Sequence, residues 1–257
     1  MSHAAPTVSI ARLPEGRGCV NDVATLALDI PLFPVERLMS LESLATARRD
    51  SLVRVGWAAV FLKAYAIVAR EMPSLRSWLA GHLHHRIATC SQSVATLAVN
   101  RSDDGDRLFF ARIARPDELP LPTLQASIDR FVREPVDKVF KRQSQFERVP
   151  GWLRRAILRW NMRSAGPKRA TRIGTFSLST LAGYSAMNRF HPTICTTSLS
   201  YGPLDDDGRC LVTVIADHRV LDGAAVAKAL ARLEAVLTGE ITAELRTARP
   251  APAEVAA

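Results

Sequence analysis

The sequence predicts a mixed α/β protein with two layers, in which a mixed β-sheet carries helices packed on one side. Strand-like runs that pair into hairpins alternate with long apolar or amphipathic helical runs, and no internal repeat is present. The 257 residues are 47% hydrophobic and 23% charged, which suffices for a full-sized core. We expect one domain over residues 23–240, an N-terminal extension over 1–22 and a disordered tail over 241–257.

The N-terminal part of this domain predicts a strand and a buried helix. Residues 23–30 (VATLALDI) are typical of a strand, which we expect to end at Pro31 and Pro34. Residues 55–71 are apolar on nearly every side, and this favours a helix inside the core, closed by Pro73.

The middle of the chain predicts a hairpin and a second helix. Residues 86–100 and 108–112 are strand-like, and the SDDGD between them has the Asp and Gly chemistry of a tight connection. Residues 121–131 predict a helix that leads into a basic amphipathic segment, 141–172.

The C-terminal part predicts a second hairpin and an amphipathic helix. Strand-like runs occur at 174–180, 193–201 and 210–216, and PLDDDGR supplies a turn between the last two. Apolar residues then repeat at helical spacing from near Gly223, and Gly239 is placed to cap this helix.

The net positive charge of the chain comes from one segment. Segment 141–172 holds ten Lys and Arg residues against the single acid Glu147 and so accounts for the whole net charge of +9. A nucleic-acid-binding surface more often spreads or repeats such charge, so no nucleic-acid partner is expected.

The remaining composition indicates a soluble protein. The longest apolar stretch, 55–69, is interrupted by Lys63 and is shorter than the roughly 20 residues of a membrane-spanning helix. The first residues lack the apolar run of a secretory signal, so we expect a location in the cytoplasm or peripheral to a membrane. The cysteines form no CxxC pair and are expected to be buried thiols: Cys19, Cys90, Cys195 and Cys210.

The segment DHRVLDGA, residues 217–224, is the most informative part of the chain. It joins an apolar strand to an amphipathic helix, a junction that places side chains at the edge of a sheet. His218 is a candidate general base, because imidazole has an ordinary pKa near ~6.5 and exchanges a proton near neutral pH. Asp222 and Gly223 are expected to hold the turn. The alternative is a histidine with only a structural role there.

DHRVLDGA followed by a helix closely resembles the active-site signature of the catalytic domain of dihydrolipoyl acyltransferases, the core component of 2-oxo acid dehydrogenase complexes. GTFSLST at 174–180 resembles the GTFTISN segment of that family, and weaker similarity covers 55–78 and 93–105. The resemblance implies the chloramphenicol acetyltransferase-like fold over about residues 23–240.

The resemblance also implies roles for three residues. His218 matches the catalytic base, which takes the proton of an acceptor thiol so that the thiolate attacks a thioester carbonyl. Ser179 matches the serine whose hydroxyl donates to the oxyanion, although the match could slip to Ser177. Asp222 matches an acid that orders the active-site turn and transfers no proton.

The resemblance implies an assembly and a substrate as well. In the family the active site lies between subunits of a trimer, the base and the serine come from different chains, and coenzyme A enters by a channel. A homotrimer that uses coenzyme A, an acyl-CoA or a carrier-bound thioester is therefore expected. The chain carries no lipoyl domain, so we expect a stand-alone form with no covalent lipoyl group and no metal.

The basic segment departs from the family, and three interpretations stay open. Arg154, Arg155 and Arg159 are candidates for pairing with the phosphates of coenzyme A. Alternatively the segment lies on an anionic membrane or a partner protein, or it is a solvated face with its apolar side on the core. The apolar side is formed by Trp152, Leu153, Ile157 and Trp160.

Other motifs and functions are weaker. His82, His84 and His85 suggest a metal but have no paired carboxylate or cysteine, and Asp205 to Asp207 form a loop too short for an EF-hand. Peptide-synthetase condensation domains share an HHxxxDG motif, but Asp217 precedes His218 here. The alternatives to an acyltransferase are an inactive oligomeric scaffold and a membrane-surface adaptor of the same fold.

Overall fold

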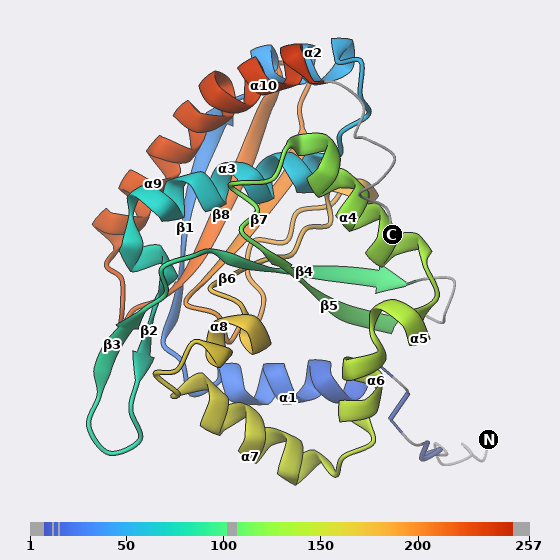
Figure 1. Ribbon diagram of the computed structural model, residues 1–257, viewed down its shortest axis with the longest axis vertical. Helices are drawn as coiled ribbons and strands as arrows, with labels where there is room; N and C mark the ends of the chain where they lie inside the picture. Colours follow the sequence, from blue (N-terminus) through green and yellow to red (C-terminus); the bar gives the residue numbers. More distant parts are fainter. Residues whose placement is uncertain (1–7, 12, 15, 102–106, 249–257) are drawn as a thin grey trace, which may run out of the picture.

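A six-stranded mixed sheet forms the centre of the computed structural model (Figure 1), which describes residues 8–11, 13–14, 16–101 and 107–248. The strand order is β1-β8-β7-β6-β4-β5. β6 runs parallel to both of its neighbours, and the other pairs are antiparallel. The strands are β1 (Leu32–Ser40), β4 (Val94–Arg101), β5 (Arg107–Ala114), β6 (Phe176–Leu178), β7 (Thr197–Leu204) and β8 (Arg209–Asp217).

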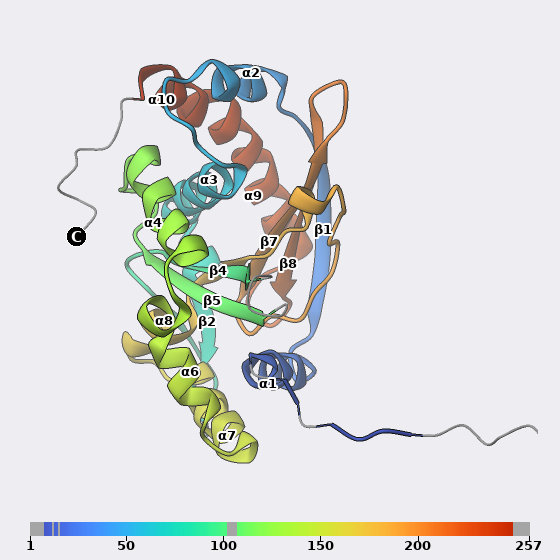
Figure 2. The ribbon, with the colours of Figure 1, turned by 90° about the vertical axis from the view of Figure 1, so that its right-hand side faces the viewer.

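Helices cover one face of this sheet, here called the core face (Figure 2). They are α2 (Glu42–Asp50), α3 (Trp57–Glu71), α4 (Leu121–Arg133), α9 (Gly223–Val236) and α10 (Thr242–Thr247). The predicted buried helix is confirmed, because α3 is buried from Ala59 to Ala69 and stacks Phe61 on Tyr201 of β7. The mixed sheet with helices on one side is therefore confirmed, as are both predicted hairpins and the helix at 121–131.

The predicted N-terminal strand is wrong. Residues Arg17–Ala27 form the helix α1, which crosses the expected boundary at residue 22, and the edge strand β1 starts only after Pro31. Two carboxylates explain its place against the basic segment: Asp22 within α1 and Asp29 just after its end both pair with arginines of that segment. Pro34 lies inside β1, where an edge strand tolerates the missing N–H.

The predicted strand 86–100 is two strands. β3 (Arg86–Thr89) pairs with β2 (Ser77–Ala80) in a separate small sheet that follows the short 3-10 helix η1 (Pro73–Arg76), and β4 begins at Val94. The SDDGD connection lies outside the described residues.

The C-terminal helix does not end at Gly239. α9 continues through a π-helical turn, η4 (Leu237–Ile241), into α10. Glu244 of α10 binds Lys63 of α3 (Nζ–Oε2 2.6 Å) and accepts the backbone N–H of Leu121 at the start of α4. The expected disordered tail is therefore wrong for residues 241–248, and 249–257 lie outside the described residues.

A second group of helices lies at the end of the molecule opposite α2 and α10 (Figures 1 and 2). It comprises α1, α5 (Val136–Val139), α6 (Lys141–Glu147), α7 (Gly151–Met162) and α8 (Lys168–Ile173). Glu147, the one acid of the basic segment, accepts the N–H groups of Gly16 and Cys19 at the start of α1. Across the part of the chain described, no helix is both long and apolar enough to span a bilayer.

Candidate functional site

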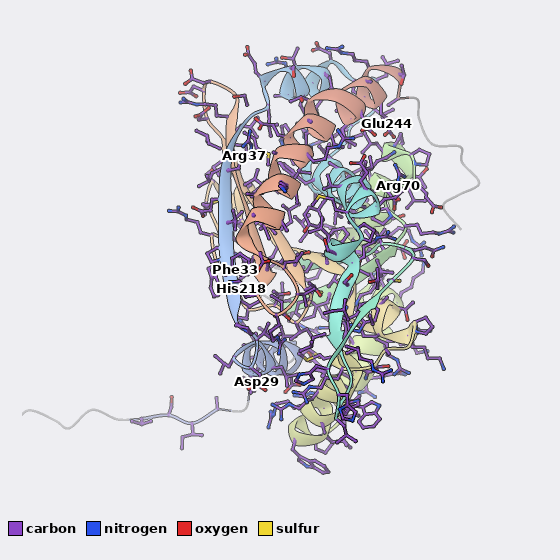
Figure 3. The ribbon with its side chains drawn as sticks, turned by 90° about the vertical axis from the view of Figure 1, so that its left-hand side faces the viewer. Asp29, Phe33, Arg37, Arg70, His218 and Glu244 are labelled. Atoms are coloured by element: carbon purple, nitrogen blue, oxygen red, sulfur yellow. The ribbon has the colours of Figure 1, made fainter. Side chains whose placement is uncertain are left out.

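His218 lies immediately after the last residue of β8, at one end of the sheet (Figure 3). Its backbone N–H donates to the Pro31 carbonyl (3.0 Å), and its ring packs beside Phe33 of β1, with centroids 4.7 Å apart. The side chain is 59% exposed. The backbone of His218 is thus fixed while its imidazole stays accessible to solvent. A general base that acts on a substrate needs both properties.

Asp217 and Arg219 order the turn around His218. The buried Asp217 carboxylate accepts the backbone N–H of Arg219 (3.0 Å) and two guanidinium bonds at 2.9 and 2.8 Å. The Asp217 carbonyl accepts the N–H groups of Val220 and Leu221. The ion pair between the two residues that flank His218 therefore fixes the backbone of the turn.

Within the described residues, the Asp222 carboxylate makes no hydrogen bond to the turn of its own chain. Its carboxylate is 85% exposed and lies 3.8 Å from Nδ1 of His218, beyond hydrogen-bond distance. It is the N-cap residue of α9, but its side chain makes no capping hydrogen bond. The buried acid of the turn is Asp217, which immediately precedes the histidine. From the sequence, the ordering role was expected for Asp222 and no role for Asp217.

Ser179 follows the last residue of β6, and its backbone N–H donates to Leu199 of β7 (3.1 Å). Among the residues that the structure describes, its hydroxyl has no hydrogen-bond partner. The alternative, Ser177, bonds to Thr193 (3.1 Å) and to Ser198 (2.7 Å). The geometry favours Ser179, because its hydroxyl is free to donate to a substrate.

Ser179 and His218 do not meet within one chain. Leu178 pairs with Leu199 of β7, so Ser179 continues this register to the level of Ser200. Ser200 pairs with Thr213 at the middle of β8, whereas His218 follows the C-terminal end of β8. Five strand positions and two strand spacings separate them, about 16 Å along the strands and about 10 Å across them. Chemistry that uses both residues therefore requires a second copy of the chain.

The candidate phosphate-binding arginines are bonded inside the chain. Arg154 and Arg155 both pair with the buried Asp22, and Arg159 pairs with Asp29 (2.7 Å). Arg154 also donates to two backbone carbonyls and is itself buried. The proposal of Arg154 as a phosphate ligand is therefore wrong, because its guanidinium already holds α7 against α1.

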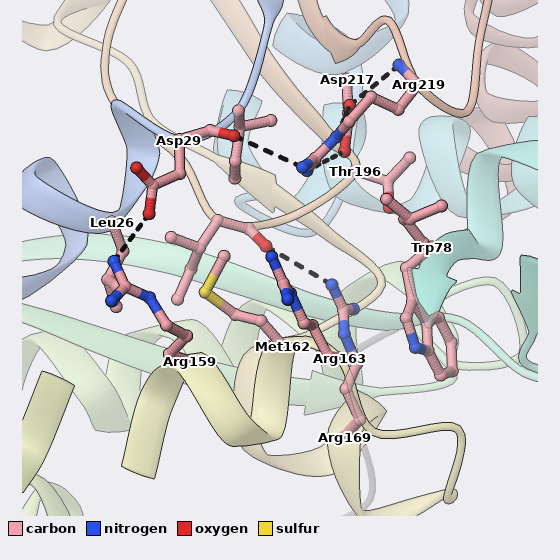
Figure 4. A pocket seen from close by; sticks show the side chains of 13 residues that line it. Leu26, Asp29, Trp78, Arg159, Met162, Arg163, Arg169, Thr196, Asp217 and Arg219 are labelled. Carbon is pink, nitrogen blue, oxygen red and sulfur yellow. Dashed lines mark hydrogen bonds and ion pairs between the residues drawn. The ribbon is translucent and has the colours of Figure 1, made fainter. Parts of the chain in front are cut away.

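A small cavity next to the histidine turn is lined by arginines (Figure 4). Its volume of about 40 Å³ has room for a few waters or one oxyanion group. Arg169 is 2% exposed and lies over the Trp78 ring, and burial lowers the pKa of its guanidinium. Neither Arg169 nor Arg163 has an ion pair within the described ranges, so this cavity retains positive charge. The lining arginines are Arg159, Arg163, Arg169 and Arg219.

His191, which no motif in the sequence indicated, lies on the side of the sheet opposite the core face. Nε2 of His191 is 2.7 Å from the hydroxyl of Ser198, which is fully buried on β7 and joins Ser177 and Thr193 in one network. Burial lowers the pKa of His191 to about 4, so the ring is neutral at physiological pH. No sequence motif marks it, because the network that it joins is completed by Ser177 of β6, which lies in another part of the chain.

The weaker metal candidates have other contacts. His82 stacks on Trp160 at 4.0 Å, and Arg209 pairs with Asp205 and Asp207 at the β7–β8 turn. The described ranges contain no group of three or more His, Cys, Asp or Glu side chains that could hold a metal ion. Three of the cysteines are buried as expected, and Cys90 is half-buried.

Solved structures share this fold, whereas no protein-family model and no curated protein matches the sequence. A probable dihydrolipoamide acetyltransferase from Listeria monocytogenes 4b F2365 has a TM-score of 0.67 at 17% identity, over 91% of this chain and 95% of the other. Azotobacter vinelandii dihydrolipoamide acetyltransferase has a TM-score of 0.64 at 19% identity, over 94% and 99%. A chloramphenicol acetyltransferase has a TM-score of 0.55 at 9% identity, over 84% and 94%.

These comparisons confirm the chloramphenicol acetyltransferase-like fold that the two motifs predicted. In the Azotobacter enzyme a serine, a histidine and an asparagine were investigated for their role in the catalytic mechanism, and the asparagine follows the histidine by four positions. Asp222 follows His218 at the same interval here.

Proposed function

We propose that this protein is an acyltransferase that moves an acyl group from a coenzyme A or carrier-bound thioester to a thiol or hydroxyl acceptor. The observation that carries the proposal is the exposed His218 imidazole, held by its backbone and by Phe33 at the end of β8. The fold shared with acetyltransferases supports it.

The proposed mechanism begins with proton transfer. His218 accepts the proton of the acceptor thiol or hydroxyl, and the resulting anion attacks the thioester carbonyl carbon. The tetrahedral oxyanion accepts a hydrogen bond from Ser179 of a neighbouring copy. When the intermediate collapses, the C–S bond of the donor breaks, and the leaving thiolate takes the proton back from His218.

The proposed assembly is a homotrimer, as the family resemblance implies. The separation of Ser179 from His218 within one chain supports a site shared between copies. In this assembly each interface completes one site, with the base from one chain and the oxyanion donor from the next.

The cavity beside the turn is proposed to hold an anionic group of the substrate. No carboxylate of the described residues neutralises Arg163 or Arg169, and guanidinium forms strong charge-assisted bonds to phosphate. Arg169 donates from both Nη atoms to the Gly174 and Ile194 carbonyls, but its buried Nε has no hydrogen-bond partner among the described residues. The small volume fits one such group and not a whole coenzyme A.

The test is thiol release from acyl-CoA donors of different chain length, in the presence of small thiol and alcohol acceptors. His218→Ala should abolish turnover while the oligomer stays intact, and Ser179→Ala should reduce it by about 10²-fold. Lys228→Gln, an exposed change on α9, serves as the control. Absence of turnover with every donor, together with no binding of coenzyme A by calorimetry, would indicate an inactive scaffold instead.

A mixing experiment tests the shared site. When His218→Ala and Ser179→Ala chains are unfolded and refolded together, random assortment leaves both groups intact in about one quarter of the sites. Activity should therefore return to about a quarter of the wild-type value. Mixtures as inactive as the separate variants would contradict a site built from two copies.

A further inference from the structure

The helix α7 presents an apolar outer face to solvent. This outer face consists of Trp152, Leu153, Ala156, Ile157 and Trp160, which fall on one side of the helix at 100° per residue. Trp152 and Trp160 are 68% and 66% exposed, respectively. Of the three interpretations of the basic segment, the solvated face with its apolar side on the core is therefore wrong.

Polar contacts on the opposite side hold α7 in this orientation. Arg154 is buried against Asp22, and the buried Asn161 accepts a hydrogen bond from Arg172 of α8 (2.6 Å). Turning the apolar face inward would break both contacts and leave a buried carboxylate without a partner. The contacts of Arg154 and Asn161 therefore keep the two tryptophans exposed.

The β2–β3 hairpin extends this apolar surface. His82 at its tip stacks on Trp160, with ring centroids 4.0 Å apart, and the neighbouring Leu83 is 91% exposed. The Gly81 N–H donates to the Arg163 carbonyl (2.8 Å), which ties the hairpin to the end of α7. Figure 1 shows the β2–β3 hairpin and α7 at the same end of the molecule. The contact between His82 and Trp160 joins the apolar side chains of these two elements, which are far apart in the sequence.

Exposed positive charge lies on the segment that leads into α7. Lys141, Arg142 and Arg148 are exposed on α6 and just after it, and none forms an ion pair with any residue that the structure describes. Glu147, the one acid of segment 141–172, is used at the start of α1. A second copy of this surface would bring like charges together, whereas an anionic surface would complement them.

We propose that α7 and the tip of the β2–β3 hairpin dock on an anionic lipid bilayer, with the apolar outer face in the headgroup region. Tryptophan is suited to this depth because its ring is apolar and its N–H is polar. Apolar burial and attraction of Lys and Arg to acidic lipids together give such helices their affinity. The docking would hold the protein at the membrane surface without a spanning helix.

The experiment is flotation of the whole chain with vesicles of phosphatidylcholine alone or mixed with phosphatidylglycerol. We expect binding to the mixed vesicles only, and a loss of binding when salt rises about tenfold and shortens the Debye length. Trp152→Ala/Trp160→Ala should weaken binding by at least about tenfold. Leu52→Ala, a change at a 74% exposed residue beside α2 at the other end of the molecule, should not.

A charge-matched pair separates the electrostatic part. Arg142→Gln/Arg148→Gln should reduce binding to the acidic vesicles, whereas Arg54→Gln/Lys228→Gln removes the same charge from exposed positions elsewhere and should have little effect. No binding at low salt, or unchanged binding of the tryptophan variant, would overturn the proposal. A change of oligomeric state in the tryptophan variant without vesicles would overturn it in favour of contact between copies.

Discussion

Nε of Arg154 lies 2.6 Å from Oδ2 of Asp22 in an ion pair that joins α7 to α1. The Asp22 side chain is fully buried and that of Arg154 is 10% exposed. Two further bonds from Arg154 to the carbonyls of Glu147 and Val149 leave little of the guanidinium for any ligand. This pair determines which side of α7 faces the protein.

Asp22→Asn should destabilise the fold by about 3 to 5 kcal/mol, because it leaves a buried guanidinium without its counter-charge. The measurement is the free energy of unfolding from urea denaturation. Glu234→Gln is the control, since its partner Arg37 is 45% exposed, and it should cost less than about 1 kcal/mol. Equal losses in the two variants would contradict the structural role of Asp22.

Stability should fall as pH decreases from about 6.5 towards 4, through His191. Its pKa is lowered to about 4 in the folded protein by burial, so the unfolded chain binds the proton more readily. At pH 5 the loss from this group is about 2 kcal/mol relative to pH 7.

His191→Gln, which can still bond to Ser198, should remove that part of the pH dependence in urea denaturation at the two pH values. Arg189 lowers the pKa of Glu36 below its ordinary value of 4.5, so that carboxylate adds a loss of the same sign, but at more acidic pH. An unchanged difference between pH 7 and pH 5 in the variant would assign the effect to other groups.

Gly174→Ala should destabilise the protein by about 2 kcal/mol or more, since the residue has a φ of 100° and its new Cβ would collide with the Thr96 hydroxyl. Gly174 leads into β6 and so positions Ser179, and activity should fall with stability. Gly239→Ala is the matched control. No atom lies within 4 Å of its Cβ position, and it should be neutral or stabilising in thermal denaturation.

Glu244→Gln should cost about 2 kcal/mol or more in the free energy of unfolding, because Lys63 on the buried helix α3 would lose its only carboxylate partner among the described residues. Glu240→Gln removes a 50% exposed carboxylate that pairs with Arg232 and should have little effect in the same urea titration. A neutral Glu244→Gln would mean that α10 is not anchored through this contact.

The sequence predicts the fold where local pattern and burial agree. The all-round apolar run of α3 and the alternating strands of both hairpins are found as expected, because their periodicity reflects direct packing on the core. α1 was assigned to the wrong class because its Asp22 is explained by Arg154 and Arg155, which lie 132 and 133 positions away. Local apolar content could not reveal that pairing.

The site was partly predictable for the same reason. The placement of His218 at the end of a strand follows from its motif, but the choice between Asp217 and Asp222 depends on which carboxylate faces the turn. The amphipathic pattern of α7 was recognised, yet periodicity alone does not say which face of a helix is buried. The ion pair between Arg154 and Asp22 determines which face of α7 is buried.

The carboxylate of Glu147 completes the first turn of α1 from 131 positions away in the chain. Closing so large a loop carries an entropic cost that must be met before the contact can form. We therefore expect α1 to dock after the folding transition state, with φ-values near zero at Asp22 and Glu147. Weakening these contacts should speed unfolding and leave the folding rate nearly unchanged.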